Sequence, residues 1–444
     1  MRKIVQCSIM AITALTLAGC QTPENPFQTM AEPAPVNTAA PPPPSRPPQP
    51  WRPVDAATGQ ITAVDALQNL TAEFPNSSSV RLRLLNAHLA EEDTGRALSV
   101  AQVLVQDGYA FTPGALEYLQ GLVQTAVVPA WIAAARINAE PIAASEVVAE
   151  VPATVLLPES VLHDPATDRF LVTSIVSRGL FVREGEGEWR QVDIPAAGSL
   201  AGIAIDQRRG LIWLGSGVVE QTPDPDSAFR GMIALDRTTL EVRRRVPAPA
   251  GVTISDIAVG PDGTVFGSDP VGGGVYTASM QDASMTALIA PGTFRSPQGL
   301  AVRPDGRSLF VSDYRYGIAV VTLPSRQVYR LQMEEHALLD GVDGLWLYGN
   351  ELVAMQNGLG PMRLIAITLG GGPASAASYR VIERNHPGWT EPLGGAISGN
   401  ALVYIGTGQW ELFGEGGALA EGLEPQPTAI HRVPLVESEA ESLE

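Results

Sequence analysis

The stretch SPQGLAVRPDGRSLFVSD, residues 296–313, carries the clearest structural signal in this chain of 444 residues. Two short apolar runs flank the turn sequence Pro304-Asp305-Gly306, and the second run ends in Ser-Asp. The stretch ISDIAVGPDGTVFGSD, residues 254–269, repeats this arrangement. Proline presets φ, while aspartate and glycine suit the remaining turn positions. Each stretch therefore predicts two β-strands joined by a tight turn, with Asp262 and Asp305 as turn formers.

Further units of the same kind follow one another along the chain. They are aligned on the residue at the start of an apolar strand, namely Glu159, Ala201, Ser255, Gln298, Asp343 and Gly394. Successive starts are 42, 54, 43, 45 and 51 residues apart, which fits one four-stranded propeller blade per unit. We therefore predict a mainly β protein in which residues 151–435 form a six-bladed β-propeller. A β-sandwich is the structural alternative, and the regular spacing argues against it.

A helical pattern precedes this β region. Residues 56–128 carry apolar side chains at helical spacing in four runs, and Thr112-Pro113 provides a cap followed by proline at the first helical position. Two helical hairpins of this size resemble a small tetratricopeptide-like (TPR-like) module, and an unrelated helical cap is the alternative. Residues 129–150 are expected to connect the helices to the propeller.

The N-terminal residues 1–19 are typical of an export signal, because Arg2 and Lys3 precede an apolar stretch. The sequence Leu-Ala-Gly-Cys that ends at Cys20 resembles the lipobox of bacterial lipoproteins. This resemblance implies lipidation of Cys20, and Gln21 after it implies the outer membrane, with the protein facing the periplasm. An ordinary signal peptide with a chance cysteine is the alternative.

The two ends of the mature chain differ from its body in composition. Residues 20–55 are rich in proline and predict an extended linker, which cannot pack as a globular core would. Residues 436–444 predict a frayed acidic tail. We expect the lipid on Cys20 to be the membrane attachment and the propeller to be monomeric.

Charge and residue usage exclude several function classes. The chain has 29 Lys+Arg against 47 Asp+Glu, a formal net charge of −18, which argues against nucleic-acid binding. Lys3 is the only lysine, so the folded body has no lysine for a Schiff base or a P-loop. With Cys7 in the signal and Cys20 carrying lipid, no thiol remains for a disulfide, a zinc cluster or a nucleophile.

Polar residues recur at the positions that should surround one mouth of the propeller channel. The innermost strand of each blade lines the channel, and the second strand ends at the same mouth as the first one starts. The strand starts contribute Glu159, Ser255 with Asp256, Gln298 and Asp343, and the second-strand ends contribute Asp269, Asp313, Gln356 and Asn357. Such oxygen donors suit a hard divalent cation, Ca²⁺ or Mg²⁺. Turn capping is the alternative role for Asp269 and Asp313.

Residues 296–313, Val342-Asp343-Gly344-Leu345 and Pro158-Glu159 resemble blades of the regucalcin/gluconolactonase superfamily, related to strictosidine synthase-like and NHL-repeat propellers. The resemblance covers about residues 150–435. In the lactonase members it implies a divalent cation held by a glutamate of the first blade, asparagines of the middle blades and an aspartate of the fifth. Glu159 and Asp343 match the acidic positions. Ser255, with Asp256 beside it, and Gln298 stand where the family has asparagine.

The resemblance implies hydrolysis of a small lactone or ester with Ca²⁺ as the expected cation and Asp343 as general base. His386, in the segment between the fifth and sixth units, is a second candidate acid or base, and a structural role is its alternative. The competing interpretation is a binding or scaffold protein of the cell envelope. In that case the helices would recruit an envelope protein and the propeller would be an inert platform.

Overall fold

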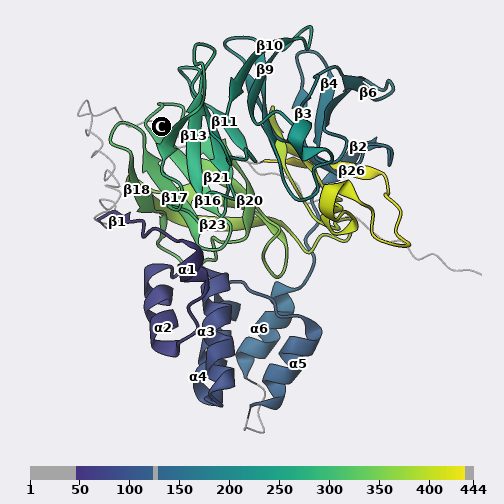
Figure 1. Cartoon of the computed structure of the whole chain (residues 1–444). Helices are drawn as coiled ribbons and strands as arrows, with labels where there is room; N and C mark the ends of the chain where they lie inside the picture. The colour runs from purple at the N-terminus through teal and green to yellow at the C-terminus, as the bar shows by residue number, and fades with distance from the viewer. Residues whose placement is uncertain (1–46, 124–128, 436–444) are drawn as a thin grey trace, which may run out of the picture. The chain divides into compact units, whose positions relative to one another are not determined.

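The structure of this chain is a computed structural model that describes residues 47–123 and 129–435 (Figure 1). These residues belong to one compact unit, Ser45–Glu444. The predicted signal peptide, Cys20, most of the linker and the acidic tail lie outside the described residues. Among the described helices, none has the length and apolar character needed to cross a bilayer.

Six separate sheets, each built on an antiparallel run of four strands, make up the β region. The first blade contains β3 (Pro158–Asp164), β4 (Arg169–Ser174), β5 (Gly179–Glu184) and β6 (Arg190–Val192). The second contains β7 (Ser199–Asp206), β8 (Leu211–Gly217), β9 (Gly231–Asp236) and β10 (Val242–Pro247). The third contains β11 (Ile257–Val259), β12 (Val265–Asp269), β13 (Gly274–Ala278) and β14 (Thr286–Ile289).

Two of the remaining blades carry a short additional strand at the outer edge. The fourth contains β15 (Pro297–Val302), β16 (Ser308–Asp313), β17 (Gly317–Thr322) and β18 (Gln327–Arg330), with β1 (Gln49–Pro50) beside β18. The fifth contains β20 (Val342–Tyr348), β21 (Glu351–Gln356), β22 (Arg363–Leu369) and β23 (Ser375–Arg384), with β19 (Gln332–Met333) beside β23. The sixth contains β24 (Gly395–Ser398), β25 (Ala401–Ile405), β26 (Thr428–Pro434) and β2 (Glu146–Val151).

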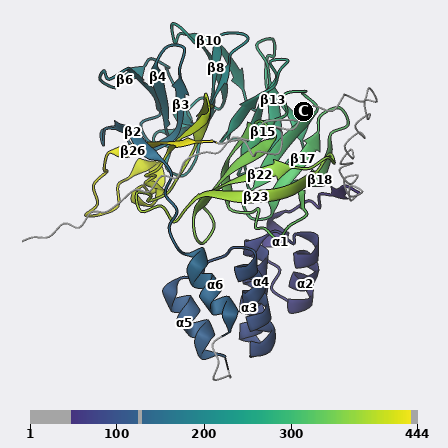
Figure 2. The same ribbon diagram turned by 180° about the vertical axis from the view of Figure 1, so that it is seen from behind.

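The sixth blade closes the ring with a strand from the other end of the β region. Strand β2, which precedes the first blade in sequence, pairs with β26 as the outermost strand of the last blade (Figure 2). The Gly394 N–H also donates to the Glu159 carbonyl, which joins the last blade to the first at the channel. Closure leaves the large sheets without long free edges. The prediction of a mainly β, six-bladed propeller preceded by helices is confirmed.

Six helices among the described residues precede β2, and they do not all fall inside the range expected for them. They are α1 (Ala56–Gly59), α2 (Val64–Glu73), α3 (Ser78–Ala90), α4 (Thr94–Gln106), α5 (Pro113–Gly121) and α6 (Ala130–Asn138). Thr112 caps α5 by accepting from the Ala115 N–H, as its sequence indicates. Residues 129–150, expected as a connector, contain α6 and β2.

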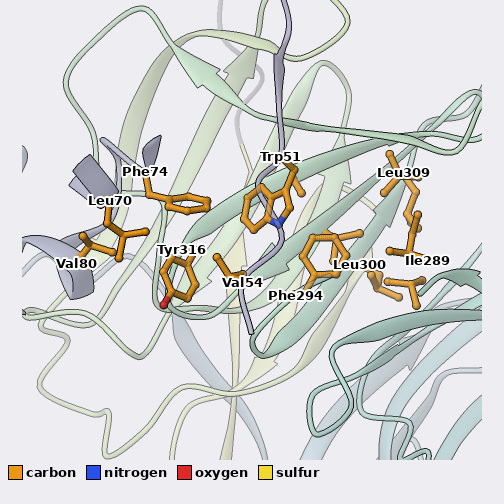
Figure 3. Close-up of a cluster of buried hydrophobic side chains, with 14 of the residues drawn as sticks. Trp51, Val54, Leu70, Phe74, Val80, Ile289, Phe294, Leu300, Leu309 and Tyr316 are labelled. Carbon is orange, nitrogen blue, oxygen red and sulfur yellow. The ribbon is translucent and has the colours of Figure 1, made fainter. Parts of the chain in front are cut away.

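An aromatic cluster packs the first helices against the fourth blade (Figure 3). Trp51 is 6% exposed, and its ring centroid lies 5.2 Å from that of Phe74, which in turn lies 4.9 Å from that of Tyr316. The Trp51 indole N–H donates to the Thr293 carbonyl at 3.1 Å. The expected linker therefore packs from β1 onward, because burying the Trp51 side chain offsets the entropy of ordering this segment.

Candidate functional site

A small cavity lies at one mouth of the central channel, where the innermost strands of the blades begin. Its volume is about 20 Å³, which is enough for one water-sized species. Its lining includes every residue predicted as a metal ligand, namely Glu159, Ser255, Asp256, Gln298 and Asp343. The tertiary structure therefore brings together side chains that are up to 184 residues apart in sequence, since 343 minus 159 is 184.

Irregular strand pairing turns these side chains toward the channel. The register of β3 on β4 shifts between Pro158 and Val161, and that of β15 on β16 shifts between Pro297 and Leu300. Strand β20 has the same irregularity between Val342 and Gly344. A bulge re-aims the residue inside it, so Glu159, Gln298 and Asp343 leave the regular alternation of their strands.

Glycines beside these residues let neighbouring blades approach closely around the channel. A Cβ on Gly202 would lie 2.7 Å from the Ser255 carbonyl oxygen, and one on Gly299 would lie 2.6 Å from the Leu345 nitrogen. The Gly202 N–H instead donates to the Ser255 carbonyl at 2.6 Å. Such close approach needs glycine and keeps the cavity narrow.

Glu159 faces the cavity from the first blade. Its Oε2 accepts a hydrogen bond of 2.8 Å from the Trp410 indole N–H. Burial raises the pKa of Glu159 well above its usual range, and the negative charge of Asp343 raises it further. The Trp410 bond acts in the opposite direction and is too weak to cancel the cost of burial.

Asp343 approaches the same cavity from the fifth blade. Burial raises its pKa to about 7, with a further contribution from the charge of Glu391. The Asn357 amide donates to Asp343 Oδ2 at 3.2 Å, and the Tyr314 hydroxyl donates to Asn357 Oδ1 at 2.9 Å. Asn357 and Tyr314 are therefore positioning residues that hold the Asp343 carboxyl group.

The third blade supplies Asp256 and Ser255. Burial raises the pKa of Asp256 to about 7, although its Oδ2 accepts from the Leu300 N–H at 2.9 Å. The Ser255 hydroxyl donates to Gln298 Oε1 at 3.2 Å. Ser255 and Gln298 thus add neutral polar groups to the carboxylates in the cavity lining.

Sequence reasoning missed two residues of this site, Glu391 and Trp410. Burial raises the pKa of Glu391, and its charge in turn raises the pKa of both Glu159 and Asp343. Glu391 stands three residues before Gly394, in the connection between the fifth and sixth units, where the repeat pattern gives no signal. Trp410 lies in the long segment between β25 and β26, whose length exceeds that of the corresponding loops in other blades.

Three other residues expected at the mouth serve as ties between segments. Asp269 accepts from the Gly272 N–H at 3.0 Å, and Asp313 accepts from the N–H groups of neighbouring loops. Gln356 donates to the carbonyls of Leu338 at 3.0 Å and Asp340 at 2.7 Å. These side chains do not line the carboxylate cavity, which matches the turn-capping alternative for the two aspartates.

His386 also lies outside the cavity lining. Its ring stacks on Trp389 with centroids 5.5 Å apart, and its Nδ1 accepts from the Gly388 N–H at 2.9 Å. Its Nε2 lies 3.9 Å from Glu383 Oε1. His386 therefore belongs to a packed polar cluster beside the Glu383 carboxylate.

Two further cavities adjoin the carboxylates. The channel beyond Asp256 has a volume of about 290 Å³ and an apolar lining that includes Leu162, Ile203, Leu300 and Leu345. A cavity of about 30 Å³ beside Glu159 is lined by Ile175, Val219, Pro270 and Trp410, among others. The carboxyl groups thus stand at a polar constriction with apolar walls on either side.

The chemistry of the donors fits a hard divalent cation. Among the described residues, Glu159 and Asp343 accept one side-chain hydrogen bond each, which leaves further acceptor positions of both carboxylates open at the cavity. No group of three or more His, Cys, Asp or Glu side chains in residues 47–123 and 129–435 is arranged to hold a metal ion. A cation there would need Ser255, Gln298 or water to complete its shell.

Comparison with known proteins gives structural neighbours and no family. No protein-family model matches the sequence, and no curated protein matches it. Regucalcin, a calcium-binding protein from Agrobacterium tumefaciens, has a TM-score of 0.42 at 16% identity and covers 65% of this chain and 96% of that one. A gluconolactonase from Xanthomonas campestris has a TM-score of 0.42 at 13% identity, with coverages of 67% and 100%.

A putative glucose dehydrogenase from Thermus thermophilus has a TM-score of 0.42 at 15% identity and covers 66% of this chain and 100% of that one. These neighbours differ in the activities that their names state. Their likeness therefore does not select an activity, and the fold of this chain is established by its own six sheets.

Proposed function

We propose that the channel mouth binds a divalent cation, with Ca²⁺ as the first candidate, and that the protein hydrolyses small lactones or esters. One observation carries this proposal: Glu159, Asp256 and Asp343, from three different blades, meet at one cavity with room for a single water-sized species. Buried carboxylates without donors are costly, and a cation removes that cost. The oxygen-only donor set favours Ca²⁺ or Mg²⁺ over softer metals.

Glu159, Asp343, Ser255 and Gln298 would hold the cation, and Asp256 is held beside them by the Leu300 N–H. When bound, a divalent cation polarises a carbonyl oxygen and lowers the pKa of water. Asp343, oriented by Asn357, is the candidate to accept the proton of the attacking water.

The apolar walls favour a substrate with little charge of its own. The Trp410 indole N–H donates to Glu159. Trp410 also lines the cavity of about 30 Å³ beside that carboxylate, together with Ile175, Val219 and Pro270. An anionic substrate would meet the repulsion of Glu391 and Asp343, whereas a neutral lactone or ester would not. A neutral cyclic ester is therefore the substrate class that this site suits.

The test uses purified protein treated with EDTA. Adding Ca²⁺ should raise the melting temperature, by about 2.7 kcal/mol of stability at 100 times Kd. Glucono-1,5-lactone, followed by pH-stat, should be hydrolysed only with the cation present. Glu159→Gln and Asp343→Asn should abolish both effects, while Asp262→Asn, an exposed turn substitution, should leave both unchanged.

The outcomes separate this proposal from its competitor. If Ca²⁺ and Mg²⁺ leave the melting temperature of the wild type unchanged, the cation site is refuted. Cation binding without turnover of glucono-1,5-lactone or of a neutral ester such as 4-nitrophenyl acetate would remove the hydrolase assignment. The non-catalytic envelope scaffold would then be the better account.

A further inference from the structure

Three arginines line a separate cavity beside the helical region. The cavity has a volume of about 260 Å³, and its lining comes from helix α1, the start of α3 and two loops of the propeller. The residues that line it are Ala56, Gly59, Gln60, Ser79, Arg83, Arg295, Arg315 and Tyr316. We propose that this cavity binds a small oxyanion, a ligand that carries a phosphate or a carboxylate group.

The three arginines converge on one cavity whose described lining residues include no acidic side chain to pair with them. No ion pair joins Arg83, Arg295 or Arg315 to a carboxylate among residues 47–123 and 129–435. Arg83 donates to the carbonyls of Thr58 at 3.1 Å and Ile61 at 2.5 Å, which do not neutralise its charge. Three uncompensated guanidinium groups in a chain of net charge −18 therefore form a local positive site.

A buried hydroxyl group lies in the same cavity beside Arg83. Tyr316 is 2% exposed, and its hydroxyl has no well-formed hydrogen bond, although the nearby Arg83 side chain opposes the rise in its pKa that burial causes. In Figure 3 this oxygen lies on the side of the ring away from Phe74 and the apolar cluster. An unsatisfied buried hydroxyl is costly, and an anion in the cavity would accept its hydrogen bond.

Asp313 accepts hydrogen bonds from the backbone N–H groups of the two propeller arginines. Its Oδ2 accepts from the Arg295 N–H at 2.6 Å, and its Oδ1 accepts from the Arg315 N–H at 3.1 Å. One carboxyl group thus ties together the two loops that carry these arginines, while both of its oxygens are used by backbone donors. Asp313 therefore fixes the positions of the two loops without forming an ion pair with either guanidinium group.

The chemistry of the lining selects the ligand class. Guanidinium groups bind phosphate and carboxylate oxygens through paired N–H donors, and three of them favour a doubly charged anion. The volume suits a metabolite-sized ligand rather than a polymer segment. This site is separate from the carboxylate cavity, whose lining shares none of its residues.

Isothermal titration calorimetry with inorganic phosphate and, in a second arm, with citrate tests the proposal at constant ionic strength set with NaCl. Saturable binding is expected in at least one arm, and the arm that binds identifies the oxyanion type. Arg295→Gln and Arg315→Gln should each weaken binding about 10-fold or more, because each removes charge-assisted hydrogen bonds. Arg307→Gln, an exposed arginine at the opposite end of β16, should not alter affinity.

Tyr316→Phe separates ligand binding from folding. The hydroxyl has no well-formed hydrogen bond to the protein, so its removal should change the melting temperature little while weakening anion binding about 3- to 10-fold. Absence of binding in both arms would overturn the proposal. Equal weakening by Arg307→Gln and Arg295→Gln would also overturn it, because the effect would then be one of overall charge.

Discussion

Two groups of carboxyl side chains, one at the channel mouth and one near the helical region, differ in what surrounds them. At the channel mouth, Glu159 and Asp343 each accept one side-chain hydrogen bond and repel each other. Near the helical region, Asp313 accepts from two backbone N–H groups, and Asp340 Oδ2 accepts from the Ser78 hydroxyl and the Ser79 N–H, both at 2.8 Å. Burial raises the pKa in both regions.

The difference shows that burial and a raised pKa do not by themselves mark a functional carboxylate. Asp340 holds the start of α3 against the propeller, and Asp313 holds two loops together, so both have structural work that explains their burial. Glu159 and Asp343 instead accept one side-chain hydrogen bond each, from Trp410 and Asn357. Asp340 Oδ1 also lacks a hydrogen-bond partner, so the feature that distinguishes the channel mouth is the convergence of several carboxylates on one cavity.

Asp340→Ala should give the largest change in stability. It removes two hydrogen bonds to a buried carboxylate at the N-terminus of α3, so the free energy of unfolding should fall by about 3 kcal/mol in urea titrations. Asp343→Ala, three positions away, should change it by less than about 1 kcal/mol in EDTA-treated protein. Equal losses in the two variants would contradict the comparison.

Asp256→Asn should produce a pH-dependent gain in stability that is intermediate in size among these predictions. The pKa of Asp256 rises from 3.8 to about 7 on folding, so its ionisation destabilises the cation-free fold. Below about pH 4 the carboxyl group is protonated in both states and costs nothing, and the penalty grows until about pH 7. The variant should therefore match the wild type at pH 4 and exceed it by about 1–3 kcal/mol at pH 8.

Melting temperatures in EDTA across this pH range would provide the measurement. Asp262→Asn serves as the control, because its carboxyl group is exposed in a turn. A gain for Asp256→Asn that is the same at pH 4 and pH 8 would show that ionisation of this group is not the cause.

Tyr314→Phe should give the smallest change in stability. It removes the hydroxyl that donates to Asn357 Oδ1, so stability should fall by about 1 kcal/mol. Tyr329→Phe is the matched control, since its exposed hydroxyl donates to Gln327 at 2.6 Å and its loss should cost less than about 0.5 kcal/mol. Indistinguishable urea midpoints for the two variants would remove Tyr314 from the group that positions Asp343.

Sequence patterns were sufficient for the repeated part of the fold. The Pro-Asp-Gly turns and the spacing of strand starts depend on local backbone preferences, so they predict the blades and the residues that begin each innermost strand. The closing strand β2 could not be predicted in this way. Its pairing with β26 joins residues that are about 280 positions apart, and no local signal encodes that partner.

The site shows the same division between repeated and irregular segments. Glu159, Ser255, Asp256, Gln298 and Asp343 occupy equivalent repeat positions, so the sequence could place all five at one mouth. Trp410 and Glu391 lie in segments that do not repeat, and so does the connection that carries His386. Their surroundings depend on how long loops fold back, which periodicity does not reveal.

Composition alone established that residues 21–444 contain neither lysine nor cysteine, so lysine and thiol chemistry are not available there. Only the tertiary structure decided which carboxylates are free and which are occupied, because that depends on backbone donors brought from distant segments. The tertiary structure also decided which arginines lie together without a carboxylate partner. Arg83 and Arg295 are more than 200 residues apart in sequence, and they line one cavity because the first helices pack against the fourth blade.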